Sequence, residues 1–481
     1  MWESLARVNA VVGGVVWGPV GLALLFGTGC LLTVRTGFFQ LRYFGYWMRH
    51  TIGAIFLDRN VTAHTDDEAI SQFQSLCTAL AATIGTGNIV GVAAAILAGG
   101  PGAVFWMWVT ALIGSSTAFI EATLAQLYKE KDPLYGGYRG GPAYYIHAYV
   151  EEKQKKKRNK VVISVLFAIS GLICWCGISQ VISNSVVSSF KNAFSIPPIY
   201  TTVVLVAVAA VIVLRKNAPV KVLDMIVPIM AVVYFAITIL IIVMNIGSLP
   251  GVFARIFQEA FGFRQVAAGG FGAVLMNGIK RGLFSNESGM GSAPIAAAAA
   301  QTRNPVRQAL VSSTGTFWDT VVVCLMTGLV LVTTIMKNPN INADEVSDGG
   351  VLTSLAFGQI PVLGPLILTL GIICFAYSTI LGWAYYGERC VEYFAGRFGK
   401  GVLIGYRLLY VAVAAIAPVV ALDLIWLIAD TLNAFMAVPN LIAVLLLSNV
   451  IVKETKEYIN DLDKKDETPI PVIKTKSGSV N

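Results

Sequence analysis

Charged residues and histidine are scarce in this sequence. Only 13% of its 481 residues are Asp, Glu, Lys or Arg and only three are histidine, whereas 56% are hydrophobic and the mean hydropathy is +0.70. This composition is too apolar for a soluble protein of such length and is typical of a polytopic membrane protein. The histidines, His50, His64 and His147, fall in predicted loops, which argues against a histidine metal site or proton relay.

The cysteines do not indicate a disulfide framework or a metal site. The seven cysteines are scattered through apolar runs, where thiols behave as small hydrophobic groups, and their spacing fits neither a disulfide framework nor a zinc motif. The net charge of +8, from 35 basic and 27 acidic residues, raises the question of nucleic-acid binding. However, the densest basic run, KQKKKRNK at 153–160, lies between two apolar runs, so we interpret it as a loop facing anionic membrane lipid, not nucleic acid.

Long apolar runs organise the chain. Runs of about 20 residues, the length that a bilayer core requires, predict eleven transmembrane helices. They cover residues 10–33, 73–99, 103–128, 161–190, 200–214, 221–246, 268–300, 308–336, 361–387, 402–421 and 424–451. The first run has no basic segment typical of a signal peptide, so we interpret it as a retained helix.

The basic residues predict the orientation in the membrane. Of the 35 Lys and Arg residues, 28 fall in the segments that alternate on one side and only five in those on the other. Because cytoplasmic loops carry the excess of Lys and Arg, we expect a multi-pass protein of the cell membrane with its N-terminus outside and its C-terminus in the cytoplasm. The tail at 452–481 is polar and poor in large apolar residues, so we expect it to be disordered.

Two of the apolar runs are interrupted in the middle. The sequence Gly85-Thr86-Gly87-Asn88 lies inside the run 73–99, and Ser285-Asn286-Glu287-Ser288-Gly289 lies inside the run 268–300. Charges and helix-weakening glycines are costly at bilayer depth, where non-helical backbone persists only inside protein or around a cavity. We therefore predict two broken helices that line a binding site.

The positions of the two breaks predict an internal repeat. Without the first helix, ten spans remain, and they divide into two groups of five that each open with a broken helix. Since five is odd, the second group starts from the opposite side of the membrane, so the repeat is inverted and the breaks meet near the midplane. The predicted all-α fold thus consists of an extra helix and loop (1–72), two five-helix repeats (73–246 and 268–451) and the tail.

The first break suits a carboxylate and a hard cation. The segment Gly85-Thr86-Gly87 is expected to expose amide N–H groups at the start of a half-helix, where anions bind favourably. Carbonyl groups freed near Ala81 and Ile84 are suitable oxygen ligands for a cation such as Na⁺. The alternative is helix packing, because small residues recur at every fourth position from Gly87 to Gly99.

The second break suits an ammonium group or Na⁺. Phe284-Ser285 lies at the predicted end of a half-helix, whose carbonyl groups attract cations. Lys280, Arg281 and Glu287 lie around this break. We expect these charges to pair with one another or with Glu121, and to hold the break or gate an entrance rather than contact a substrate.

Three other spans carry polar residues with two interpretations each. Ser378 and Thr379 are adjacent hydroxyls in an apolar run, suited to Na⁺ or to bonding their own backbone. Gln180 and Asn184 lie one turn apart and fit either substrate contact or interhelical hydrogen bonding. Asp319 fits an ion-linked role or simple pairing with a neighbour.

Several long motifs resemble those of the alanine or glycine:cation symporter family, and they occur in the expected order over nearly the whole chain. They are ATIGTGNIVGVAAAI, GGPGAVFWMW, GGPAYY, NGIKRGLFSNESGMGSAPIAAAAA and STILGWAYYGE. The family's Ser-Asn-Glu signature is matched at 285–287, and Ser288 stands where alanine is common.

The resemblance implies a LeuT-type fold and Na⁺-coupled, in some members H⁺-coupled, uptake of small neutral amino acids. By matching motif, it assigns the substrate pocket to Thr86, Gly87, Gln180, Phe284 and Trp383. It assigns one sodium site to Ala81, Ile84, Ser378 and Thr379, and a second to Asn88. In this interpretation the first break holds the substrate carboxylate, and no organic cofactor is needed.

The expected function is therefore secondary active transport, namely symport of alanine or glycine with Na⁺ by alternating access. The alternatives within this class are a carrier of glutamine or another neutral amino acid, and an H⁺-coupled version. A channel needs a continuous polar stripe, an enzyme needs a nucleophile–base or metal constellation, and a receptor needs a soluble output domain. The sequence favours none of these three.

Overall fold

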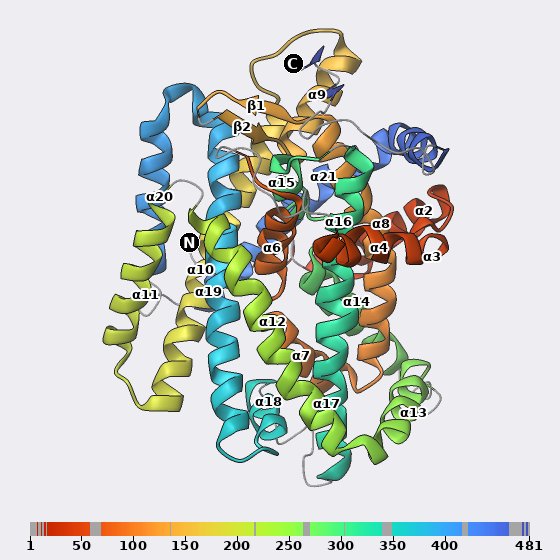
Figure 1. Cartoon of the computed structure of the whole chain (residues 1–481), viewed down its shortest axis with the longest axis vertical. Helices are drawn as coiled ribbons and strands as arrows, with labels where there is room; N and C mark the ends of the chain where they lie inside the picture. Colours follow the sequence, from red (N-terminus) through yellow and green to blue (C-terminus); the bar gives the residue numbers. More distant parts are fainter. Residues whose placement is uncertain are drawn as a thin grey trace.

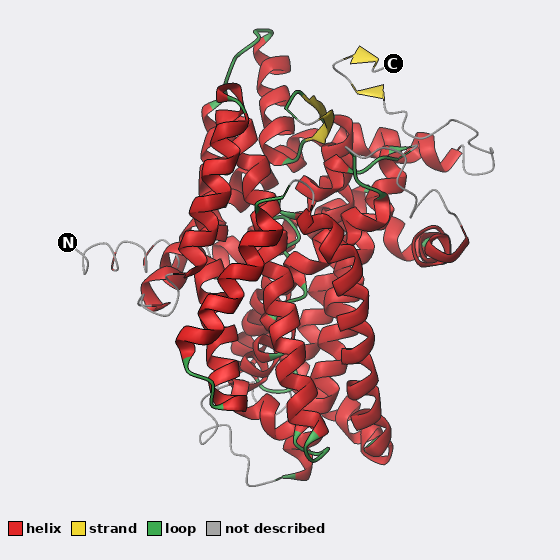
Figure 2. Cartoon of the chain, turned by 60° about the vertical axis from the view of Figure 1, so that its left-hand side comes forward, coloured by secondary structure: helices red, strands yellow, loops and turns green. Residues whose placement is uncertain are grey.

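The computed structural model describes residues 17–57, 69–134, 136–215, 218–262, 270–302, 304–338, 349–415 and 422–460, together with a few isolated positions nearer the two ends. The described chain is almost entirely helical, and its long helices run side by side along the longest axis of the molecule (Figures 1 and 2). Six of them are long and apolar enough to cross a membrane. This arrangement agrees with the all-α membrane architecture that the apolar runs predict.

The helices of the N-terminal half follow the predicted spans closely. They are α2 (Pro19–Arg35), α3 (Phe39–Arg42), α4 (Phe44–Leu57), α6 (Gln72–Thr83), η1 (Thr86–Asn88), α7 (Val90–Gly99), α8 (Ala103–Leu127), α9 (Pro142–Gln154), α10 (Val162–Phe194), α11 (Pro198–Val213), α12 (Ala218–Met244), η2 (Ile246–Ser248) and α13 (Leu249–Ala260). An antiparallel hairpin joins α8 to α9; its strands are β1 (Glu130–Asp132) and β2 (Gly136–Arg139).

The C-terminal half also consists mainly of helices. Its helices are α14 (Gly270–Asn286), α15 (Ala293–Ala299), α16 (Pro305–Thr316), the π-helical η4 (Phe317–Cys324), α17 (Leu325–Lys337), α18 (Gly349–Phe357), α19 (Leu363–Ala395), η5 (Gly396–Phe398), α20 (Lys400–Ala415) and α21 (Leu422–Asn460). Two short strands, β3 (Lys474–Thr475) and β4 (Gly478–Ser479), pair near the C-terminus.

Both predicted helix breaks are confirmed. After α6, the backbone of Ile84 and Gly85 is extended, and one short 3₁₀ turn precedes α7. After α14, Glu287, Gly289 and Gly291 adopt positive φ angles of 52°, 89° and 84°. This region of backbone space favours glycine, which explains why the second break is glycine-rich.

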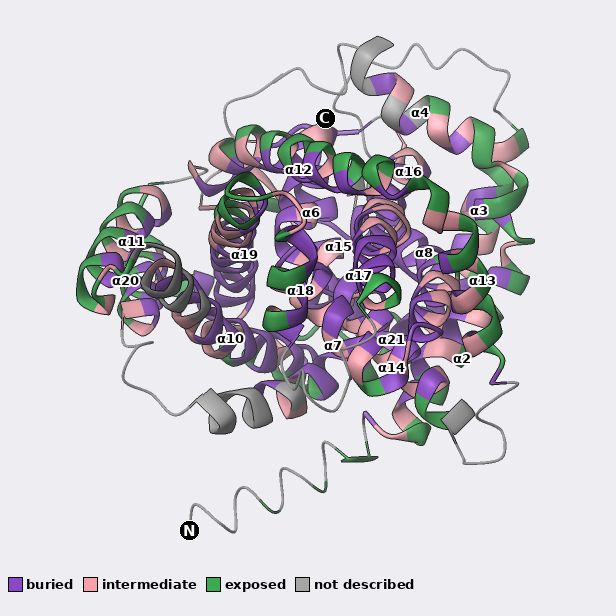
Figure 3. Ribbon diagram, turned by 90° about the horizontal axis from the view of Figure 1, so that it is seen from below, coloured by how far each residue is buried: buried purple, intermediate pink, exposed green. Residues whose placement is uncertain are grey.

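The broken helices occupy the interior of the bundle. Seen from below, buried ribbon concentrates in the middle, whereas the outward sides of α11, α12 and α20 are exposed (Figure 3). Apolar side chains such as Val203 and Leu408 are 59% and 54% exposed on that periphery, as expected of a surface that faces lipid. Close packing holds α14 against α8, since a Cβ added at Gly278 would lie 2.5 Å from the Cβ of Trp106.

Several segments predicted as loops contain short helices. The predicted loop 34–72 contains α3 and α4, the predicted loop 129–160 contains the hairpin and α9, and α13 and α18 lie at the lower end of the molecule in Figure 1. These helices escape a search for long apolar runs because each is too short to span a bilayer. In α13 only one face is apolar, and its buried residues are Val252, Ile256 and Ala260. Helix α21 also continues to Asn460, past its predicted end. Much of the stretch 10–16 and of the tail lies outside the described residues.

Candidate functional site

A cavity of about 50 Å³ lies where the two broken helices meet. The unwound segment after α6, the end of α14 and the following break line it, together with α10, α19 and α21. The lining residues are Ala82, Thr83, Gly85, Thr86, Gly87, Trp175, Ile178, Ile182, Phe284, Ser285, Glu287, Met290, Thr379, Trp383 and Asn433. The structure therefore brings together the two interruptions that the sequence places far apart in the chain.

Most of the predicted substrate residues line this cavity. They are Gly85, Thr86, Gly87, Phe284, Ser285 and Trp383. The backbone N–H groups of Thr86 and Gly87 open the short helix η1, so they have no partner within it and remain suited to an anion.

Gln180 and Asn184 do not belong to the lining. Residues two apart on a helix point about 200° apart, and Gln180 lies between Ile178 and Ile182, which do line the cavity. Its Nε2 donates instead to the carbonyl of Val413 on α20, at 3.2 Å. Contact of Gln180 and Asn184 with a substrate thus stays a prediction that this geometry does not favour.

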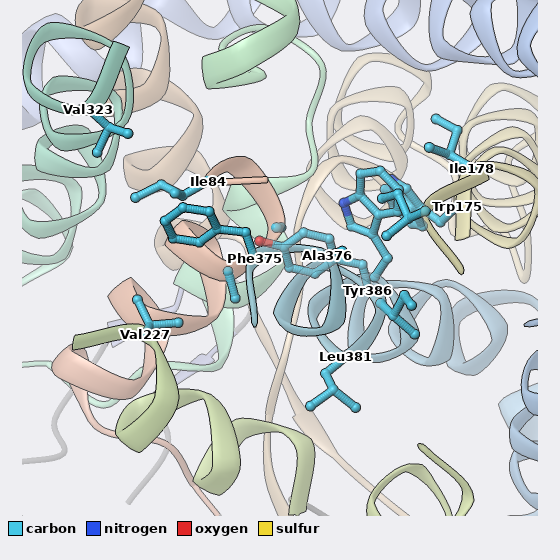
Figure 4. Packing of buried hydrophobic residues seen from close by; sticks show 14 of the residues in the cluster. Ile84, Trp175, Ile178, Val227, Val323, Phe375, Ala376, Leu381 and Tyr386 are labelled. Atoms are coloured by element: carbon cyan, nitrogen blue, oxygen red, sulfur yellow. The ribbon is translucent and has the colours of Figure 1, made fainter. Parts of the chain in front are cut away.

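Helix α10 contributes residues that sequence analysis missed. Trp175, Ile178 and Ile182 form a helical stripe that faces the cavity. In Figure 4, Trp175 lies beside Tyr386 of α19, and the centroids of the two rings are 5.6 Å apart. The stripe is visible in the sequence, but its spacing is also that of an ordinary buried helix face.

Asn88 ties the first break to the second. Its Oδ1 accepts a hydrogen bond from the Gly85 N–H at 2.9 Å, and its Nδ2 donates to Ser285 Oγ at 3.0 Å and to Asp319 Oδ1 at 2.6 Å. Asp319 Oδ2 also accepts from Ser285 and Thr320. Asp319 lies in η4, and π-helical turns frequently occur at functional sites. Asn88 therefore stabilises the unwound turn as well as providing polar atoms near it.

The predicted sodium ligands are partly brought together. Thr379 Oγ1 lies 2.9 Å from the carbonyl oxygen of Ala81 and 2.9 Å from that of Phe375. Ile84 is buried and follows α6 in extended conformation. Ser378 Oγ donates to Phe375 at 2.9 Å, so its hydroxyl bonds its own helix, as the alternative interpretation allows.

The acidic residues around the second break differ in their surroundings. Glu287 lines the cavity and accepts a hydrogen bond from the hydroxyl of Ser292. Glu121 accepts from the Gly289 N–H at 3.1 Å and from Asn440. Within the described part of the chain, the ion pairs include neither carboxylate. The expected pairing of Glu287 with Lys280 or Arg281 is therefore not found.

The model of the sodium:alanine symporter family matches residues 2–472. The chain belongs to this family. It is 45% identical over 469 residues to the sodium/alanine symporter AgcS of Methanococcus maripaludis. The aligned region covers 96% of this chain and 99% of the relative. It is 36% identical over 465 residues to the probable sodium/glutamine symporter GlnT of Bacillus subtilis, with 95% and 91% covered.

Solved structures confirm the fold of this sodium:alanine symporter family member. A manganese transporter of Eremococcus coleocola superposes with a TM-score of 0.52 at 12% identity, covering 85% of this chain and 92% of that one. At that identity the likeness concerns the fold alone, which is the LeuT-type fold that the motifs imply. The protein is thus a multi-pass membrane symporter rather than an enzyme, with sodium as its co-transported ion. The number of eleven spans stays a prediction.

Proposed function

We propose that this symporter carries glycine or alanine together with Na⁺ into the cell by alternating access. The observation that carries the proposal is the size of the cavity between the breaks, about 50 Å³, and its enclosure by bulky side chains such as Trp175, Phe284 and Trp383. A small cavity walled by such bulky side chains suits a small amino acid better than glutamine. The similarity to AgcS, a sodium/alanine symporter, supports the same substrate class.

In this proposal the substrate carboxylate binds the first break. The N–H groups of Thr86 and Gly87 and the hydroxyl of Thr86 line the cavity at the start of a helix, which is a favourable position for negative charge. The side chain of the substrate then contacts the apolar stripe of α10. Gln180 and Asn184 lie outside the described lining of the cavity.

Sodium is proposed to bind between α6 and α19. The carbonyl of Ala81 and the hydroxyl of Thr379 are already adjacent, and Ile84 and Ser378 supply further oxygen atoms nearby. Na⁺ is a hard cation that prefers such neutral oxygen ligands. A second sodium ion is proposed near Asn88, where Asp319 adds a negative charge. Because α6 belongs to the first repeat and α19 to the second, sodium there stabilises the unwound segment that binds the substrate.

The proposed orientation places the hairpin and α9 in the cytoplasm of a plasma-membrane protein, with the N-terminus outside. The basic run 153–160 begins in the last turn of α9, and its basic residues other than Lys160 are exposed. This position suits contact with the anionic inner leaflet. The exposed apolar sides of the outer helices are proposed to contact lipid tails.

The test is uptake of radiolabelled alanine into proteoliposomes with an inward Na⁺ gradient and with K⁺ in its place. Unlabelled glycine, serine and glutamine serve as competitors, and empty liposomes are the control. We expect accumulation only with Na⁺, and competition by glycine but not by glutamine. Equal uptake in K⁺ that disappears with the pH gradient would assign the coupling to H⁺. Strong competition by glutamine would contradict the size argument.

A further inference from the structure

Among the described residues that line the cavity, Glu287 is the one with an acidic side chain. The Gly85–Gly87 segment lines the cavity from the first break, and Glu287 lines it from the second. The sequence alone favours a structural or gating role for this residue. Its position favours direct contact with whatever occupies the cavity.

The backbone at Glu287 is constrained. Its φ of 52° lies in the left-handed region, which is uncommon for residues other than glycine, asparagine and aspartate. Neighbouring positions with positive φ, Gly289 and Gly291, are glycines. A non-glycine residue persists in such a conformation when the surrounding structure fixes it, which happens most often at functional sites. A requirement for the carboxylate at this position explains why glycine does not stand there.

Among the residues that the structure describes, no ion pair includes Glu287. The charged groups that act on it are two buried carboxylates, those of Asp319 and Glu121. Asp319 accepts hydrogen bonds from the side chains of Asn88, Ser285 and Thr320, and Glu121 accepts from a backbone N–H and from Asn440.

In the described part of the chain, the carboxylate of Glu287 accepts one hydrogen bond, from Ser292. An ionised carboxylate removed from water is costly unless a cation or several donors compensate it. Of these three carboxylates, Glu287 is both the one with the fewest donors and the one that lines the cavity. Glu287 is half-buried, whereas Glu121 and Asp319 are buried. The missing cation is therefore expected to enter with the ligand.

We propose that Glu287 is the counter-ion of the substrate's ammonium group. The site then selects zwitterions, whose carboxylate binds the first break and whose ammonium binds Glu287, over α-hydroxy acids and other monocarboxylates of the same size. This inference rests on the proposed amino-acid transport and adds the residue that recognises the amine. Ser292 is a positioning residue, because its hydroxyl donates to the Glu287 carboxylate.

The test is equilibrium binding of labelled L-alanine and, separately, labelled L-lactate to the purified full chain at saturating Na⁺. Lactate has the size and carboxylate of alanine but a hydroxyl in place of the ammonium. We expect Glu287→Gln to weaken alanine binding about 10- to 100-fold, the usual value of a hydrogen bond to a charged group. The affinity for lactate should not fall, so the ratio of the alanine affinity to the lactate affinity should fall by the same factor.

Two further variants keep the test decisive. Glu121→Gln is the matched control, a buried carboxylate at the same break but outside the cavity lining; its alanine-to-lactate ratio stays that of the wild type, even where its unfolding temperature falls. Glu287→Asp retains the carboxylate on a side chain that is shorter by one methylene, so it should keep the preference for alanine but bind it more weakly. It replaces Glu287→Gln if the latter does not fold.

Three outcomes overturn the assignment in different ways. If Glu287→Gln folds and keeps the wild-type alanine-to-lactate ratio, then Glu287 does not contact the ammonium group. If Glu287→Gln binds alanine with wild-type affinity at saturating Na⁺ but needs more Na⁺ to do so, then Glu287 acts on the ion and not on the substrate. A wild-type protein that binds no alanine with Na⁺ refutes the proposed function itself, and the role of Glu287 falls with it.

Discussion

Replacing Gly87 by alanine is expected to separate glycine from alanine as substrates. Gly87 lines the cavity, and a Cβ added to it meets no heavy atom within 4 Å. Its φ lies outside the left-handed region, so alanine is compatible with the backbone there. The variant should therefore fold, and the new methyl group should occupy part of a cavity of only about 50 Å³.

The size of the effect follows from the one methyl group that distinguishes the two substrates. Alanine carries a methyl group that glycine lacks, and in Gly87→Ala the new Cβ reduces the volume of the cavity that is left for it. One methylene in an apolar pocket changes discrimination by about 1–3 kcal/mol, or about 10- to 200-fold. We expect the preference for alanine over glycine to fall by a factor in this range, with glycine transport much less affected.

The assay is Na⁺-driven uptake of labelled glycine, with unlabelled alanine as the competitor. Gly91→Ala is the matched control, because a Cβ there also meets nothing within 4 Å but Gly91 does not line the cavity. Its alanine inhibition should equal that of the wild type. A Gly87→Ala protein that transports glycine and is inhibited by alanine at wild-type concentrations would refute the idea that volume at this position limits the substrate.

Three other substitutions have expected outcomes. Thr379→Val keeps the side-chain volume but removes the hydroxyl 2.9 Å from the Ala81 carbonyl, so the Na⁺ concentration for half-maximal uptake should rise about fivefold; an unchanged sodium curve would exclude the hydroxyl from the ion site. Thr86→Val should weaken alanine uptake at least about fivefold at equal expression, and unchanged uptake would move the carboxylate site elsewhere. Arg407→Met should lower the free energy of unfolding by about 3–5 kcal/mol, because it leaves Glu388, bound at 2.7 and 2.8 Å, buried without its partner. The double variant Arg407→Met/Glu388→Leu should recover most of that loss in thermal unfolding, and a single variant as stable as the double would contradict the pairing.

The fold could be predicted where the physics of the bilayer leaves few choices. Long apolar runs must be helical in lipid, and the two breaks stand out because charged residues and glycines interrupt them. Nothing comparable identifies α13 or α18, because α13 is apolar on one face only and α18 is apolar but very short. Such helices depend on tertiary packing, so the apolar-run criterion assigns them to loops.

The site could be predicted only where its residues are unusual for a membrane helix. Thr86 and Ser285 were found because they lie at the breaks, and both line the cavity. Trp175 and Ile178 were missed, because an apolar residue that faces a small cavity has the same spacing as one that faces a neighbouring helix. Gln180 was chosen for its polarity, yet its helix turns it toward α20. Polarity identifies hydrogen-bonding positions, whereas much of this cavity wall is apolar.

The contacts between the breaks also suggest how ion and substrate binding are coupled. Asn88 at the first break hydrogen-bonds Ser285 and Asp319, and Thr379 of α19 contacts Ala81 of α6. In the proposed alternating access, a movement of one proposed repeat against the other must break these contacts or move both partners together. A ligand that bridges the repeats therefore stabilises the closed arrangement by its differential affinity, as any population shift requires. Sodium between Ala81 and Thr379 and an amino acid between the two breaks stabilise the same arrangement, so each is expected to strengthen the binding of the other by an equal factor.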